Sequence, residues 1–118
     1  MNERTVYFNL DLDQQSAMEY VNVRRGDTET CLSVGLSEGG ASYELAEGVS
    51  AVLAAQKSDG TYITPESCTI SKNRLIVKLS AAITGTSGMV KACFALSGGS
   101  AAISTPDFTI LVSEIPKE

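Results

Sequence analysis

The sequence predicts an all-β fold, an antiparallel β-sandwich of about eight short strands that is immunoglobulin-like or jelly-roll-like. Apolar residues alternate with polar ones along much of the chain, and a period of two is the period of a β-strand. Glycine-rich turns separate the alternating runs. One open sheet of this composition would leave its apolar face in water, so a second sheet must cover it.

Three runs in the first half of the chain alternate apolar with polar residues, and each predicts a strand. They cover residues 6–12, 21–24 and 31–36. The second run ends at Arg25-Gly26-Asp27-Thr28 and the third at Gly39-Gly40, and both segments have the composition of tight turns.

Residues 49–57 are ambiguous, because three alanines would also suit a helix. Gly48 precedes this segment and Ser58-Asp59-Gly60-Thr61 follows it, and Asp-Gly is a strong signal for a hairpin turn. We therefore predict a strand over residues 49–57 that turns back into a second strand at Tyr62.

The second half of the chain is interpreted in the same way. Pro65 is expected to interrupt the returning strand, and residues 68–70 to form a separate short strand. Alternation predicts further strands over residues 74–79, 90–96 and 108–112. Residues 84–88 and Gly98-Gly99 are expected to form a loop and a turn.

The chain length of 118 residues predicts one domain over residues 1–118. Its core is expected over about residues 5–113, and residues 114–118 as a linker or tail. Two interpretations stay open: the sequence is the N-terminal part of a longer protein, or it is a short protein complete in itself.

The charge is acidic and unevenly distributed, with a net charge of −5. Residues 1–60 carry 10 acidic and 4 basic side chains, whereas residues 61–118 carry 4 acidic and 5 basic ones. This balance argues against a nucleic-acid partner, because phosphate binding needs clustered Lys and Arg. No apolar run approaches the length of a membrane span, and the start does not resemble a signal peptide, so we expect no membrane insertion.

Catalytic chemistry is not expected. His is absent, which removes the commonest general base and the commonest zinc ligand. No Gly-x-Ser-x-Gly elbow and no phosphate-binding loop occurs. We predict that the protein is not an enzyme and has no catalytic residue, no metal and no cofactor.

Two weaker signals for a metal or a reactive thiol also fail. Asp11 and Asp13 have the spacing that opens a calcium loop, but Gln15 and Ser16 stand where an oxygen ligand and a glycine are needed. An odd number of cysteines without a signal peptide predicts reduced thiols made in a cytoplasm. These cysteines are far apart in the sequence: Cys31, Cys68 and Cys93.

The candidate partner-binding residues are Arg24, Arg25 and Asp27. The two arginines form the densest positive spot in the acidic half of the chain, which makes a contact with another molecule conceivable. Arg25-Gly26-Asp27 also spells a tripeptide known from cell adhesion. The favoured alternative for both features is a solvated turn between two strands.

Turn-and-strand motifs follow one another along the chain from about Val6 to Val112. They are Gly26-Asp27-Thr28 at the start of a strand, Tyr43-Glu44-Leu45 before residues 49–57, Ser58-Asp59-Gly60-Thr61, Gly88-Met89-Val90-Lys91 leading into Phe94, and Thr105-Pro106-Asp107-Phe108 leading into Ile110 and Val112. In order and spacing they resemble the N-terminal domain of the baseplate upper protein of tailed phages of Gram-positive bacteria.

This resemblance implies a structural β-sandwich domain of the tail-tip baseplate that docks on the distal tail hub. It places the protein in the virion tail, after synthesis in the cytoplasm of the bacterial host. In the family, the rest of a longer chain carries receptor-binding proteins, and this second role stays open because the present sequence ends at Glu118. A homo-oligomer is possible, because phage assemblies are symmetric.

The alternative function is a carbohydrate-binding β-sandwich that contacts the host cell envelope. It predicts an aromatic platform on one face of the domain. The four tyrosines are expected on separate strands, which disfavours this alternative: Tyr7, Tyr20, Tyr43 and Tyr62.

Overall fold

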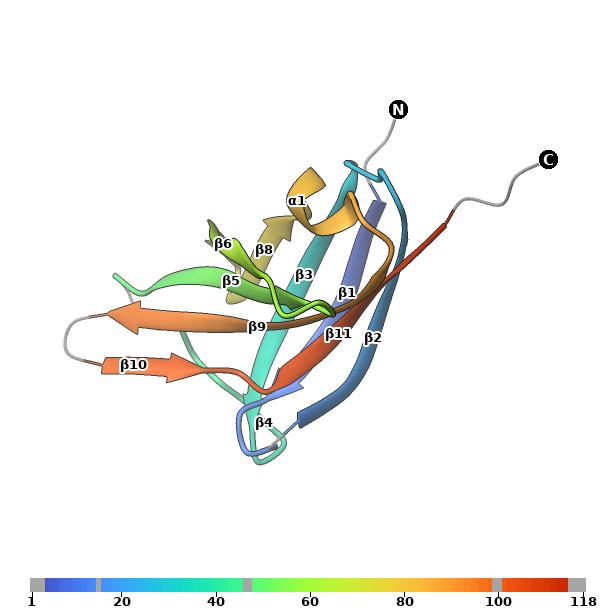
Figure 1. Cartoon of the computed structure of the whole chain (residues 1–118). Helices are drawn as coiled ribbons and strands as arrows, with labels where there is room; N and C mark the ends of the chain where they lie inside the picture. Colours follow the sequence, from blue (N-terminus) through green and yellow to red (C-terminus); the bar gives the residue numbers. More distant parts are fainter. Residues whose placement is uncertain (1–3, 15, 46–47, 99–100, 115–118) are drawn as a thin grey trace.

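Two β-sheets pack face to face in the computed structural model, which describes residues 4–14, 16–45, 48–98 and 101–114 (Figure 1). Sheet A contains, in spatial order, β1 (Arg4–Asp11), β3 (Thr30–Glu38), β8 (Arg74–Lys78) and β7 (Thr69–Ser71), with β4 (Ala41–Ser42) paired to β3. Sheet B contains β2 (Ser16–Arg24), β11 (Asp107–Ser113), β9 (Gly88–Gly98), β5 (Ser50–Lys57) and β6 (Tyr62–Ser67), with β10 (Ala101–Ser104) paired to β9. The predicted all-β sandwich is confirmed.

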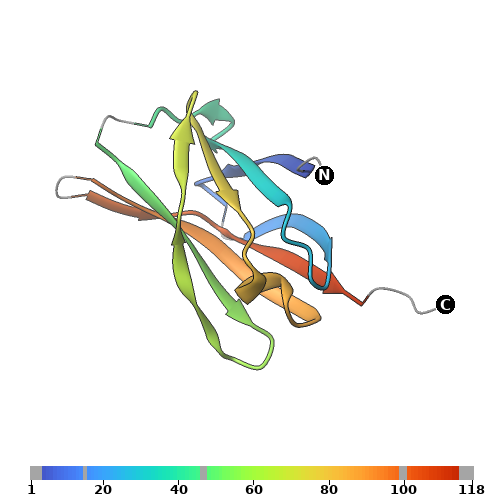
Figure 2. The ribbon, with the colours of Figure 1, turned by 90° about the horizontal axis from the view of Figure 1, so that it is seen from above.

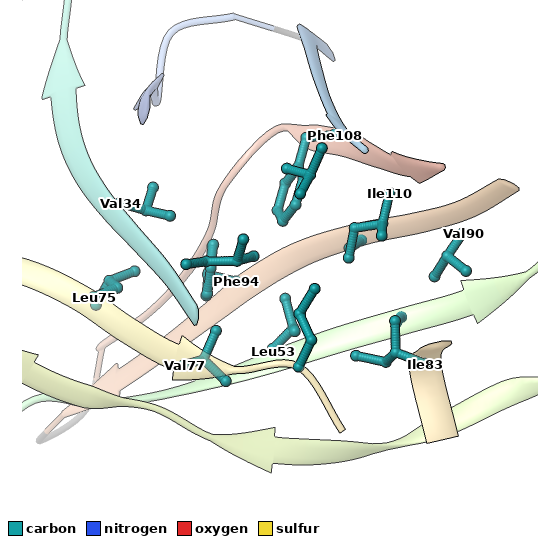
Figure 3. Close-up of a cluster of buried hydrophobic side chains, with 14 of the residues drawn as sticks. Val34, Leu53, Leu75, Val77, Ile83, Val90, Phe94, Phe108 and Ile110 are labelled. Atoms are coloured by element: carbon teal, nitrogen blue, oxygen red, sulfur yellow. The ribbon is translucent and has the colours of Figure 1, made fainter. Parts of the chain in front are cut away.

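The alternating runs place their apolar side chains between the two sheets, as alternation requires. Phe108 of β11 joins the two layers: its ring lies edge-on to that of Phe8 in β1, at 5.2 Å between centroids, and stacks on Phe94 of β9 at 5.7 Å. Buried side chains from both sheets surround these rings (Figure 3). They include Val34, Leu53, Leu75, Val77, Val90 and Ile110.

β5 confirms the strand interpretation of the alanine-rich segment. It pairs with β9 on one side and with β6 on the other. Gly60 has a φ of +92°, and the Asp59 carboxylate accepts a 2.8 Å hydrogen bond from the backbone N–H of Thr61. The predicted Asp-Gly turn between two antiparallel strands is therefore also confirmed.

Both sheets are mixed, which corrects the prediction of a purely antiparallel sandwich. β1 and β3 are parallel, and so are β2 and β11. Parallel neighbours need a connection that crosses over, and β2 supplies it for β1 and β3 because it lies in the opposite sheet. The described residues form eleven strands, more than the sequence predicts, because β4 and β10 add short pieces of two and four residues. β7, with three residues, confirms the separate short strand predicted over residues 68–70.

Pro65 lies inside β6, so the prediction that it interrupts the strand was wrong. β6 is an edge strand of sheet B, and its register with β5 shifts between Leu53 and Ala55. An edge position and an irregular register both accommodate a residue that has no backbone N–H to donate.

The two ends of the sandwich are built differently. At the end where β2 turns into β3, the single-turn helix α1 (Ala81–Thr84) covers the core with Ile83, which is fully buried. The sequence predicts no helix here, only a loop from Thr84 onward. At the other end, where β1 turns into β2 at Leu12, the β9–β10 hairpin extends away from the start of β11 (Figure 1 and Figure 2).

Some predicted features lie outside the described residues. These are the linker at residues 115–118, Gly99 of the expected turn, and Gln15 of the failed calcium pattern. Among the residues that are described, no helix has the length and apolar character to cross a membrane.

Candidate functional site

The structure brings Arg24, Arg25 and Asp27 together with Glu114, at the end of β11. Nη1 of Arg25 lies 2.9 Å from Oε1 of Glu114, and Nη1 of Arg24 donates a 2.9 Å hydrogen bond to the Glu114 carbonyl. Hydrogen bonds from the Ser87 hydroxyl and from Arg25 lower the pKa of the Glu114 carboxyl. Glu114 cannot be predicted as a partner of these residues from the sequence, because it is distant along the chain and belongs to no motif.

The turn at Asp27 is tied to α1. The Asp27 carboxylate accepts a 3.1 Å hydrogen bond from the backbone N–H of Arg24, and its carbonyl accepts a 2.6 Å bond from the Thr84 hydroxyl. Gly26, at a φ of +89°, donates its N–H to the Thr84 carbonyl. These hydrogen bonds hold the turn in one conformation against α1. A partner contact at these residues stays a prediction.

Asp11 has a structural role that its sequence pattern does not reveal. Its carboxylate accepts hydrogen bonds from the backbone N–H groups of Asp13, Gly39 and Gly40 and from the Ser37 hydroxyl. The bond from Asp13, followed by that from Gly40, lowers the pKa of the Asp11 carboxyl. Asp11 thus holds the β1–β2 turn against the β3–β4 turn. No cluster of three His, Cys, Asp or Glu side chains occurs in the described part of the chain.

The three cysteines, Cys31, Cys68 and Cys93, are half-buried. Burial raises the pKa of the Cys68 thiol to about 12, and it also raises the pKa of the Cys93 thiol. Both shifts disfavour the thiolate, which is the nucleophilic form.

Arg74 links β8 to β3 and β1 on the outer face of sheet A. Its Nε donates a 2.8 Å hydrogen bond to the Ser33 hydroxyl, and its Nη2 donates to the Ser33 and Phe8 carbonyls at 2.7 and 3.2 Å. The guanidinium also lies 5.7 Å from the centre of the Tyr7 ring. Gly35 leaves room for this arrangement, since a Cβ there would lie 3.0 Å from Nη1 of Arg74.

The exposed tyrosines form no aromatic platform in the part of the chain that the structure describes. Tyr20 and Tyr62 both alternate with buried residues and lie on the outer face of sheet B, but on β2 and β6, its opposite edge strands. Tyr7 lies on the outer face of sheet A, under Arg74. Tyr43 is partly buried against the core.

An apolar hollow of about 170 Å³ opens at the end of the sandwich opposite α1. We call this region the open end, and its lining comes from both sheets and from the segment between β4 and β5. The lining residues are Leu12, Leu36, Tyr43, Glu44, Leu45, Val49, Leu96, Ser97, Gly98 and Ile103. Ile103 of β10 is 38% exposed, so part of its side chain faces solvent at the hollow.

Exposed carboxylates accompany the open end. Glu44 lines the hollow itself, Asp13 follows Leu12 in the β1–β2 turn, and Glu38 ends β3. None of the three is ion-paired to another described residue. Lys72 lines a second hollow on the outer face of sheet A, together with Asn73 and Arg74, and Leu36 lines both hollows. The open end therefore has an apolar lining with one carboxylate in it, Glu44, and two more close by in the sequence.

No protein-family model and no curated protein matches the sequence. Among solved structures, the N-terminal domain of ORF48 of phage TP901-1 matches with a TM-score of 0.73 and 18% sequence identity. The match covers 96% of this chain and 99% of that one. The two chains share one fold. At this level of identity the likeness concerns the fold, and function has to be argued separately.

Proposed function

We propose that this protein is a structural domain of a phage tail baseplate and that it binds other tail proteins. The observation that carries the proposal is the fold, which matches the N-terminal domain of a phage protein along nearly the whole of both chains. The order of the turn-and-strand motifs supports it, because it resembles the baseplate upper protein. The expected partners are the distal tail hub protein and, through it, the rest of the baseplate.

The construction of the domain supports a binding role without catalysis. Its loops are fastened by internal hydrogen bonds, as at Asp11 and Asp27, so its surfaces are held rigid before a partner arrives. Rigid surfaces lose little conformational entropy on association. The sequence contains no His, and the pKa values of Cys68 and Cys93 are raised, which supports the proposal that the protein is not an enzyme.

Immunogold electron microscopy of purified phage particles tests this proposal. Antibodies against the domain are expected to label the tip of the tail, and immunoblots of the same particles to detect the chain. Particles from a phage with this gene deleted are the control. Particles that lack the protein, or gold at the capsid alone, would refute the baseplate role. Binding to cell-wall glycans would then be measured next, since it is the alternative function.

A further inference from the structure

We propose that the open end binds an extended segment of a partner tail protein, which adds to the free edge of β10 as a further strand. The segment inserts an apolar side chain into the hollow beside Ile103 and carries Lys or Arg opposite the exposed carboxylates. This inference rests on the proposed function and identifies the surface and the partner chemistry.

The edge of β10 is open because β2 stops short of it. β10 pairs with β9 from Ala101 to Ser104. Beyond Thr105 and Pro106, the same side of β9 is taken by β11, and β2 covers the other edge of β11 only from Asp107 onward. Within the described residues, no strand pairs with the second edge of β10. Such an edge presents backbone N–H and C=O groups that an extended peptide can use.

The other edges of the two sheets are guarded against such pairing. β6 contains Pro65 and has an irregular register with β5, and β7 has only three residues. The edges of β1 and β2 lie against each other, where Nη2 of Arg4 donates a 2.8 Å hydrogen bond to the Asn22 carbonyl. β10 has neither a proline nor a charge. Prolines, charges and short length are the usual protections of an edge strand, and β10 has only its shortness.

The hollow gives the added strand a place for a side chain. Ile103 belongs to the open strand and also lines the hollow. Alternate residues of a strand paired to β10 point to the same face as Ile103, so one of them reaches the hollow. An apolar cavity of about 150 Å³ can hold a benzene molecule, so about 170 Å³ suits one aromatic or branched aliphatic side chain.

Charge selects the partner. Glu44 lines the hollow, and Asp13 and Glu38 are one and two residues away from its lining residues Leu12 and Leu36. None of these carboxylates has an ion pair to a described residue, and they belong to a half of the chain with 10 acidic and 4 basic side chains. A second copy of this domain would bring the same carboxylates to the contact and be repelled. A segment with Lys or Arg beside its apolar residue is attracted, most strongly at low salt.

Peptide binding by the full chain tests the inference. An array of overlapping peptides covers the other tail proteins of the phage, and the tightest-binding peptide is synthesised for titration calorimetry. Bound peptides are expected to be extended, basic segments with alternating apolar residues. In the complex, hydrogen exchange at the amides of β10 is expected to slow, which reports strand addition directly. Selection of acidic peptides, or unchanged exchange at β10, would overturn the proposal.

Three variants separate the open end from other surfaces. Ile103→Lys puts a charge at the hollow and is expected to weaken binding on the order of tenfold or more. Glu44→Lys is expected to weaken binding at low salt and to flatten its salt dependence. Tyr62→Lys is the matched control, because Tyr62 is an exposed residue of a different edge strand, and it is expected to bind like the original protein. Thermal unfolding checks that each variant folds.

The outcomes distinguish this inference from the proposed function. If tail proteins bind the domain and Ile103→Lys binds them equally well, the open end is not the interface, although the tail role stands. If the domain is absent from particles and binds no tail peptide, both fail. A dimer in sedimentation experiments that Ile103→Lys abolishes would assign the open end to a second copy and overturn the choice of partner.

Discussion

The Thr105 hydroxyl completes the hydrogen bonding of β9 at the point where β10 ends and β11 begins. The backbone N–H of Phe94 donates to Oγ1 of Thr105 at 2.9 Å, and the backbone N–H of Thr105 donates to the Phe94 carbonyl at 2.9 Å. Oγ1 is also 3.2 Å from the Pro106 carbonyl. One buried side chain therefore bridges a break between two strands, which explains a Thr-Pro pair at this position in physical terms.

Replacing Thr105 tests this bridge. Thr105→Val keeps the shape but leaves the buried N–H of Phe94 without its acceptor, and is expected to lower the free energy of unfolding by about 1–3 kcal/mol. Thr105→Ser keeps the hydroxyl and is expected to cost less. Urea unfolding followed by circular dichroism measures both. Equal losses for Val and Ser would show that the methyl group, rather than the hydroxyl, matters.

Residue roles of this kind could not be predicted from the sequence. The bond from Nη2 of Arg74 to the Phe8 carbonyl joins residues 66 positions apart, and that from Nδ2 of Asn73 to the Tyr43 carbonyl spans 30 positions. Local patterns do not encode such partners. Arg24, Arg25 and Asp27 were identified because they are neighbours in sequence, whereas Glu114, which binds both arginines, was not.

At the scale of elements, α1 closes one end of the sandwich. Ser80 precedes the helix, but its hydroxyl bonds to the Glu66 carboxylate and does not cap the helix. A single turn without a side-chain cap has little stability of its own, so packing must hold it. Ile83 provides that packing, because its side chain is fully buried.

Shortening Ile83 is expected to destabilise the whole domain. Ile83→Ala creates a cavity under α1 and should cost about 2–5 kcal/mol, whereas Ile83→Val should cost about 0.5–1.5 kcal/mol. Chemical denaturation of the two variants measures the difference. A decrease of less than about 1 kcal/mol in the free energy of unfolding of Ile83→Ala would mean that α1 moves to fill the cavity and is not held by this packing.

Strand faces were predictable and strand partners were not. Alternation gave the buried faces of β3, β9 and β11, because a period of two divides a strand into an inner and an outer side. It contains no information about the direction of a neighbour, so the parallel pairs were missed. The four-residue α1 was missed because one turn is too short to show a helical period.

At the scale of the whole molecule, ionisable groups are arranged so that folding depends little on pH near neutrality. The chain has no His, whose pKa would fall in that range. Folding lowers the pKa of Asp11, Asp59 and Glu114 through hydrogen bonds, and it raises the pKa of Cys68 and Cys93 through burial. Stability should therefore decline on both sides of a neutral plateau.

The pH profile of thermal unfolding tests this arrangement. A carboxyl with a lowered pKa stabilises the folded state at pH values above its ordinary pKa, which is 3.8 for Asp and 4.5 for Glu. This stabilisation is lost as the pH falls from the ordinary pKa through the lowered one. A thiol with a raised pKa stabilises below its ordinary value of 9.0, and this is lost as the pH rises toward 12. Unfolding temperatures are measured under reducing conditions.

Two variants assign the acidic and alkaline declines. Asp11→Asn is expected to shallow the decline below about pH 4, because its amide does not titrate. Cys68→Ala is expected to shallow the alkaline decline. An acidic decline that is identical in Asp11→Asn and the original protein would remove Asp11 from this account.

The open end could be recognised only at this largest scale. Its lining combines Leu12, Leu36, Val49 and Leu96, which belong to four separate segments and look like ordinary core residues in sequence. The acidic half of the chain was visible from composition, but its placement around an apolar hollow depends on how the β1–β2 turn and the β9–β10 hairpin meet. Composition indicates the negative charge of this half of the chain, whereas its location relative to the hollow is known only from the fold.

The parallel pairing of β2 with β11 also sets the order in which the domain can be made. β11 lies between β2 and β9 in sheet B, and it begins only at Asp107, while Arg24 and Glu114 at the ends of the two strands are 90 positions apart. During synthesis on the ribosome, Val21 and Val23 of β2 lack their partner strand β11 until almost the entire domain has been made. Closure of the sandwich is thus a late and slow event, and a chain released before β11 exposes two strand edges to aggregation.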